Sequence, residues 1–172
     1  MPDSDADAKI AGQEGATPEN RISRAFYSNA DIIQRFEAAM DSLDLKAEIT
    51  EIGHGLGSIF KRGRAIRDFR AVCVVMWRLS LEKSFPDQQE EVYRDFMAGS
   101  RILGDGGGRK KLVERINLFW EVLEPQKSAD FTPLAIYLAG NLSQDLDNRK
   151  VLQLKLSLTI RRIYNFVFES LI

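Results

Sequence analysis

The fold of this chain is decided by the stretch IRDFRAVCVVMWRLSL, residues 66–81. It contains the longest unbroken apolar run in the chain, residues 71–77. A helix that is apolar over most of its circumference is usually buried among other helices. One apolar line holds Ile66, Phe69, Cys73, Met76 and Trp77, and a second beside it holds Val72, Val75 and Leu79. The three valines of the stretch are β-branched, which is typical of a strand. The length of the stretch and its lack of turn residues nevertheless favour a helix.

The composition is that of an ordinary globular protein. The chain has 172 residues, which suits one domain, with 44% hydrophobic and 28% charged residues. Its formal net charge is -1, so any contact with nucleic acid would need a local basic patch.

Three features of the sequence bear on the compartment. Cys73 is the single cysteine, so the fold has no internal disulfide, which is typical of a reducing compartment. The first residues, MPDSD, do not resemble a signal peptide. The longest apolar run is far shorter than the roughly 20 residues of a membrane-spanning helix. We therefore expect a cytoplasmic protein with no membrane span.

The first third of the chain divides into a leader and two helices. Residues 1–16 are small, polar and acidic, and we expect a disordered leader followed by one helical domain over residues 17–172. Thr17-Pro18 is typical of a helix start, and the first helix is predicted to run from there to Leu43. Its predicted buried face is Ile22, Phe26, Ala30, Ile33, Phe36, Met40 and Leu43. A second helix starts near Asp44, and its period is interrupted by Gly53, Gly55 and Gly57.

Turn residues punctuate the chain after the central helix. A fourth helix is predicted to extend through Ile102 and to close at Gly104, and residues 105–108, DGGG, to form the most flexible connection. A fifth helix ends at Pro125, and Thr132-Pro133 starts a short sixth.

The last segment, residues 145–172, fits two patterns. Leucine and isoleucine alternate with polar residues from Leu152 to Ile160, as in a strand. More than 20 residues without a turn signal are too many for a usual strand, however, so we predict a helix. The chain as a whole is then all-α, a single irregular bundle of six or seven helices.

The segment His54-Gly55-Leu56-Gly57-Ser58 resembles the phosphoacceptor helix of histidine phosphotransfer domains. The family pattern is roughly His-x-Leu-Lys-Gly, and the resemblance implies a helical bundle in which His54 accepts a phosphoryl group. Here Gly57 stands in place of the lysine and Ser58 in place of the glycine. The missing cation removes charge stabilisation that phosphoryl transfer uses, although Lys61 lies two helical turns from His54. Histidine phosphotransfer through His54 is therefore an alternative function.

Other catalytic chemistry finds little support. One histidine and one cysteine are too few for a typical zinc site, and no serine lies in a setting that would pair with His54. The Glu-x-x-His pairs of di-iron bundles are absent from the sequence. We expect no metal and no cofactor. The sequence favours a protein without catalytic activity over an enzyme.

Two clusters of cations are candidates for anion binding. Arg109, Lys110 and Lys111 follow the glycines of residues 104–108, where backbone N–H groups at a helix start can hold an anion. That segment lacks Walker-loop spacing, so a basic helix–helix linker is the competing interpretation. The second cluster is Lys61, Arg62, Arg64, Arg67 and Arg70. It suits phosphates or an acidic partner, or else ion pairs with acids of neighbouring helices.

The last helix carries apolar residues on two sides. If its inner line is Leu152, Leu156, Ile163 and Val167, then Val151, Leu154 and Leu158 lie on the far side. Contiguous exposed apolar residues usually mark an interaction surface. We therefore expect a non-catalytic protein–protein interaction module, or a small subunit of an assembly, that binds another protein or itself. Binding of nucleic acid or an acidic partner through residues 61–70 is the alternative.

Overall fold

The structure is a computed structural model that describes residues 27–52, 59–123, 130–143 and 146–172. Within these residues the chain forms seven packed α-helices and one short 3₁₀ helix, with no strand, which confirms the predicted all-α fold. The elements are α1 (Asn29–Ser42), α2 (Leu45–Ile52), α3 (Ile59–Ser84), α4 (Gln89–Gly99), η2 (Arg101–Leu103), α5 (Gly106–Leu123), α6 (Thr132–Leu142) and α7 (Leu146–Leu171). No helix of the described residues is long and apolar enough to cross a membrane.

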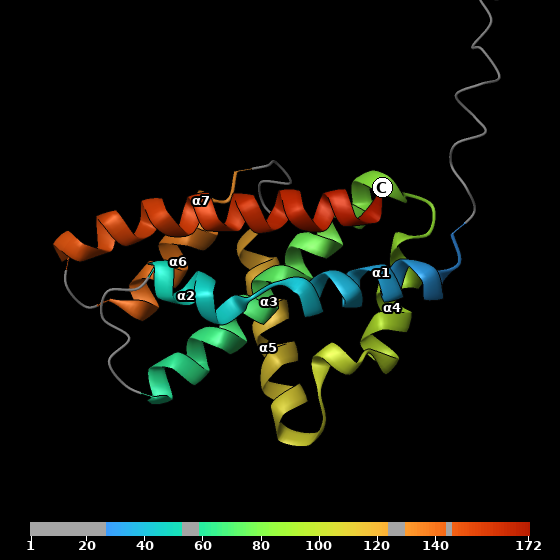
Figure 1. Cartoon of the computed structure of the whole chain (residues 1–172), viewed down its shortest axis with the longest axis horizontal. Coiled ribbons are helices and arrows are strands. Elements are labelled where there is room, and N and C mark those ends of the chain that lie inside the picture. The colour runs from blue at the N-terminus through green and yellow to red at the C-terminus, as the bar shows by residue number, and fades with distance from the viewer. Residues whose placement is uncertain (1–26, 53–58, 124–129, 144–145) are drawn as a thin grey trace, which may run out of the picture.

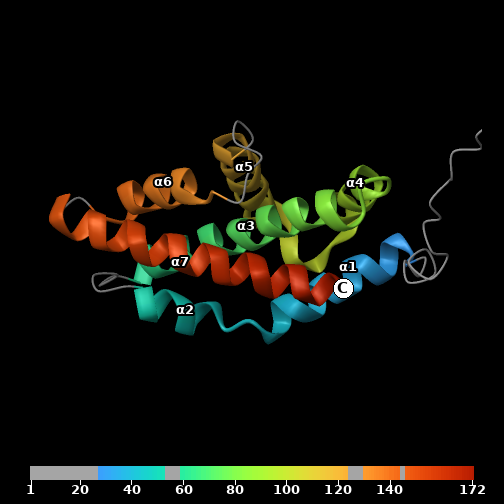
Figure 2. The same ribbon diagram turned by 90° about the horizontal axis from the view of Figure 1, so that it is seen from above.

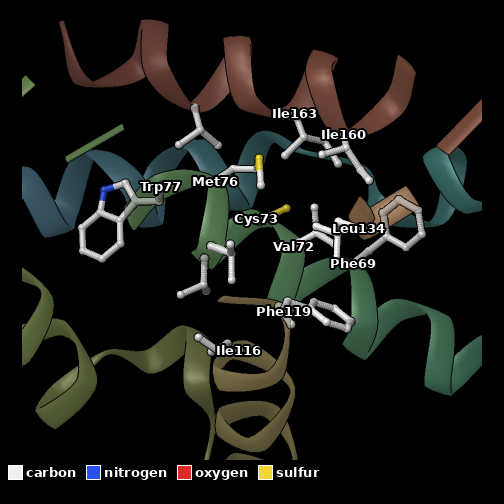
Figure 3. Packing of buried hydrophobic residues seen from close by; sticks show 14 of the residues in the cluster. Phe69, Val72, Cys73, Met76, Trp77, Ile116, Phe119, Leu134, Ile160 and Ile163 are labelled. Atoms are coloured by element: carbon white, nitrogen blue, oxygen red, sulfur yellow. The ribbon is translucent and has the colours of Figure 1, made fainter. Parts of the chain in front are cut away.

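The central helix is α3, as its apolar run predicts. Every residue from Ala71 to Trp77 is fully buried. Helix α7 lies along α3 on one side and α5 crosses it steeply on another, while α1 and α2 follow one another along α7 (Figures 1 and 2). Figure 3 shows the side chains of α3 between Ile160 and Ile163 of α7 and Ile116 and Phe119 of α5. The hydrophobic surface of α3 is therefore covered on several sides at once.

Helix α1 begins later than the sequence suggests. Ser28 has an extended backbone and forms a capping box with Asp31, in which the Asp31 N–H donates to the Ser28 hydroxyl and the Ser28 N–H donates to the Asp31 carboxylate. A single helix from Thr17 to Leu43 is therefore wrong, because the described helix starts at Asn29. The predicted buried face is also shifted: Ala30 is exposed, and Ile32, Phe36 and Ala39 are the buried residues of α1. Residues 1–26 lie outside the described part of the chain.

The predicted fourth helix is divided in two. Helix α4 ends at Gly99, and after Ser100 the chain forms the separate 3₁₀ turn η2, which contains Ile102. Glu37 of α1 explains the division, because its carboxylate accepts hydrogen bonds from the Ser100 hydroxyl (2.6 Å) and the Arg101 N–H (3.2 Å). The backbone at this point is thus turned toward α1.

The glycine-rich segment is not the flexible connection that the sequence predicts. Gly104 and Gly106 have positive φ values of 68° and 56°, which only glycine adopts at low cost. They turn the chain sharply, and α5 then starts at Gly106, so that the remaining glycines belong to its first turn.

Candidate interaction surface

Helix α7 resolves the ambiguity of the last segment in favour of the predicted helix. Residues Leu156, Ile160, Ile163 and Val167 are fully or almost fully buried against the rest of the bundle, and Leu152 is partly buried. These positions recur at three- and four-residue steps and so occupy one side of the helix. The alternating leucines thus divide between two faces of α7.

Three apolar side chains lie on the opposite side of α7, and we call them the outer α7 face: Val151, Leu154 and Leu158. Their exposed fractions are 58%, 65% and 61%. Their spacing of three and four residues aligns them in one stripe along two turns of helix. Side chains of this kind are normally buried, so three together on one stripe form an unusual surface.

Basic residues flank the outer α7 face. Lys150 and Lys155 are exposed, and neither forms an ion pair with the described residues. Farther along α7, Arg162 donates hydrogen bonds to Glu48 and Glu51 of α2, and these bonds raise the pKa of the guanidinium. Arg162 therefore ties α2 to α7, whereas the two lysines extend from α7 without an acidic partner among the described residues.

The predicted basic cluster of residues 61–70 is divided by the structure. Arg64 lies 3.9 Å from the carboxylate of Asp68, and the charge of Arg67 also acts on that carboxylate. Arg70 is exposed and lines a groove beside α2. The side chains of Lys61 and Arg62 lie outside those that the structure describes. Two of the five cations thus face an acid of their own helix.

Asp68 is a buried carboxylate that the sequence interpretation missed. It is 2% exposed, and Arg115 Nε of α5 lies 3.2 Å from its Oδ1 as an ion pair without hydrogen-bond geometry. Burial raises the pKa of the Asp68 carboxyl, opposed by the charges of Arg115, Arg64 and Arg67. Asp68 lies three residues after Ala65 and four before Val72, so it belongs to the buried face of α3. This spacing in the sequence could have predicted its burial.

The three cations that follow the glycines, Arg109, Lys110 and Lys111, also differ in their contacts. Arg109 Nη2 donates to the carbonyl oxygens of Met97 and Ala98 at the end of α4. Helix ends leave such carbonyls without partners, so Arg109 acts as a cap for α4. Lys110 and Lys111 are exposed. Arg109 is thus engaged within the protein, and an anion at this helix start stays an untested prediction.

The remaining candidates for catalysis stay without structural support. His54 lies outside the described residues. Cys73 is fully buried, and burial raises the pKa of its thiol to about 12, so it stays protonated at neutral pH. The described residues contain no group of three or more His, Cys, Asp or Glu side chains that could hold a metal ion.

Comparison of the chain with family models, curated proteins and solved structures found no match.

Proposed function

We propose that this protein is a non-catalytic helical interaction module, or a small subunit of an assembly, that binds a partner protein through the outer α7 face. The observation that carries the proposal is the exposure of Val151, Leu154 and Leu158 on one stripe of a helix whose opposite side is buried in the core. Burying one such side chain contributes roughly 1.5–3 kcal/mol, which drives association once the cost of ordering the two chains is met.

The flanking charges favour one kind of partner. A symmetric pair of α7 helices would bring the same patch of two copies together, so that Lys150 and Lys155 of one copy would face the cations of the other. Like charges across an interface oppose association, whereas complementary charges favour it. The partner that fits is an amphipathic helix with apolar residues at i, i+3 and i+7 and flanking Asp or Glu residues.

A synthetic helical peptide with leucines at those positions and glutamates beside them is a direct probe. Fluorescence anisotropy should show saturable binding to the wild type, and much weaker binding of the same peptide with lysines in place of the glutamates. The double variant Leu154→Glu, Leu158→Lys should lose binding of the glutamate peptide. Its melting temperature should stay close to that of the wild type, since both side chains are already exposed. Ile172→Glu is the control, because this exposed apolar residue lies beyond the end of α7 and far along the chain from the outer α7 face. This variant should bind the peptide normally.

Three results would contradict the proposal. Unfolding of the double variant would mean that these leucines are covered in the whole protein, because burying two unpaired charges is strongly destabilising. Equal binding of both peptides would remove the role of Lys150 and Lys155. A wild-type dimer in sedimentation that the double variant converts to a monomer would identify a second copy as the occupant.

A further inference from the structure

A groove of about 600 Å³ lies where α1 turns into α2, and α3 and η2 line it as well. Its apolar lining includes the partly buried Met40 of α1, Leu43 of the turn, Ile66 of α3 and Ile102 of η2. Small-molecule sites in proteins are concave, largely apolar and of this order of size, with a few polar groups that orient the ligand. The polar groups of the groove therefore decide what it can bind.

Both carboxylates of the groove are already engaged within the protein. Asp41 is paired with Arg101, whose hydrogen bond holds the pKa of the Asp41 carboxyl below its usual value. The Asp44 carboxylate accepts hydrogen bonds from the N–H groups of Lys46 (3.0 Å) and Ala47 (3.1 Å) and so caps the start of α2. Asp41 is thus neutralised by an ion pair, whereas the Asp44 carboxylate is held by backbone N–H groups and keeps its charge.

The cations of the groove differ in whether they are paired with an acid of the protein. Arg101 is neutralised by Asp41 and Glu37, the latter at 3.0 Å. The Lys46 ammonium and the Arg70 guanidinium are exposed, and neither forms an ion pair or a side-chain hydrogen bond with the described residues. The charged groups of the groove that have no side-chain partner or capping role among the described residues are thus two cationic donors, one on α2 and one on α3.

We propose that this groove binds a small amphiphilic anion, whose carboxylate or phosphate head is held by Arg70 and Lys46. The apolar chain of the ligand lies on Met40, Leu43, Ile66 and Ile102. A guanidinium suits either head group because its planar donors match two oxygens at once. This site shares no residue with the outer α7 face and is independent of the proposed function.

Four ten-carbon probes test the proposal by isothermal titration calorimetry: decanoate, decyl phosphate, decanol and decylammonium. Decanoate, decyl phosphate or both should bind saturably, and the relative affinity of the two identifies the preferred head group. Decanol should bind at least about tenfold more weakly and decylammonium should not bind, because charge-assisted hydrogen bonds supply the difference. Inorganic phosphate alone should bind far more weakly than decyl phosphate, since it lacks the apolar chain.

The double variant Lys46→Gln, Arg70→Gln should weaken binding of the anions at least about tenfold and keep the wild-type melting curve. Lys110→Gln with Lys111→Gln removes two exposed cations from α5 and is the matched control, with binding unchanged. The Leu154→Glu, Leu158→Lys protein should also bind normally, which separates this site from the outer α7 face. The proposal is overturned by decanol binding as tightly as decanoate, by normal binding in the Lys46/Arg70 variant, or by no saturable binding of either anion.

Discussion

At position 77 an indole ring fills the space between α3, α1 and α4. It is fully buried, stacks on Phe36 with the ring centroids 4.6 Å apart, and lies 4.7 Å from Phe96. Aromatic pairs of this geometry contribute beyond their buried area. The Trp77 side chain thus contacts residues of two other helices. A smaller side chain at this position would leave a cavity between the three helices.

Trp77→Ala should lower the free energy of unfolding by about 3–5 kcal/mol. That is a large part of the roughly 5–15 kcal/mol that stabilises a domain. Chemical denaturation followed by circular dichroism measures the loss. Trp120→Ala is the control with the same change in side chain, and its smaller expected loss follows from its partial exposure. Equal losses in the two variants would contradict the central place of Trp77.

Asp68 makes stability depend on pH in a direction that its burial determines. The folded pKa lies above the ordinary value of 3.8, so above that pH the unfolded chain releases the proton more readily than the folded protein does. The stability of the wild type relative to Asp68→Asn should therefore fall as the pH rises from about 4 through the folded pKa. Thermal melts across this range measure it.

Asp41→Asn is the control for Asp68, because the folded pKa of Asp41 lies below 3.8. Its wild-type carboxylate should lose its small stabilising effect as the pH falls below that value, which is the opposite direction. A wild-type advantage over Asp68→Asn that grows with pH would show that the attraction of Arg115, Arg64 and Arg67 outweighs the cost of burial.

Among the elements, α4 and α5 show how a glycine-rich joint is held in place. The positive φ values of Gly104 and Gly106 turn the chain, and Arg109 of α5 reaches back to the carbonyls of Met97 and Ala98. Arg78 of α3 completes the joint, because its guanidinium lies 4.4 Å from the ring of Tyr93 on α4 and 3.8 Å from that of Trp120 on α5. Side chains rather than loop stiffness therefore set the angle between these helices.

Arg109→Ala should lower the free energy of unfolding by about 1–3 kcal/mol, because two carbonyls at the end of α4 lose a charged donor. Arg109→Lys should recover only part of the loss, since the ammonium of the shorter lysine side chain does not reach as far as the Arg109 Nη2 atom that donates both bonds. Lys110→Ala, at an exposed neighbouring position, should stay within about 0.5 kcal/mol of the wild type. Urea denaturation compares the three, and a Lys110→Ala loss equal to that of Arg109→Ala would mean that Arg109 has no special role as a cap.

Helix α7 contributes to the core on one side and carries the proposed interaction surface on the other. Its inner residues Leu156, Ile160, Ile163 and Val167 are only 0–1% exposed, whereas the side chains of the outer α7 face are more than half exposed. Its anchoring to α2 through Arg162 and to α3 through the core keeps the outer stripe on a rigid support. A binding surface on a rigid helix loses less conformational freedom on association than one on a loop.

Across the whole molecule, the two proposed sites use different parts of one scaffold. The outer α7 face depends on a single helix, so its residues are continuous in the sequence. The groove depends on the turn between α1 and α2 together with Arg70 of α3 and Ile102 of η2. Helix α3 contacts α2, and its Trp77 stacks on Phe36 of α1, so α3 supports two of the other elements that line the groove.

The sequence by itself determined the helical class, the buried central helix and the outer α7 face. All three follow from local periodicity, because the spacing of apolar residues along one helix states which side is buried. The break after Gly99 was missed since Glu37, which holds it, is more than 60 residues away. Helix propensity also gave the wrong prediction for residues 106–108, because three glycines form the start of α5.

Only the tertiary structure decided which charges are free. In the sequence, Arg64, Arg67, Arg70 and Arg109 are equivalent cations. In the fold, Arg109 donates hydrogen bonds to α4 and Arg64 faces Asp68, while Arg70 lies beside a groove and pairs with no acid of the described residues. The physical reason is that hydrogen bonds and ion pairs are short-ranged, so a charge is neutralised by whichever group the packing of distant helices brings within about 4 Å. Local spacing carries no information about that neighbour.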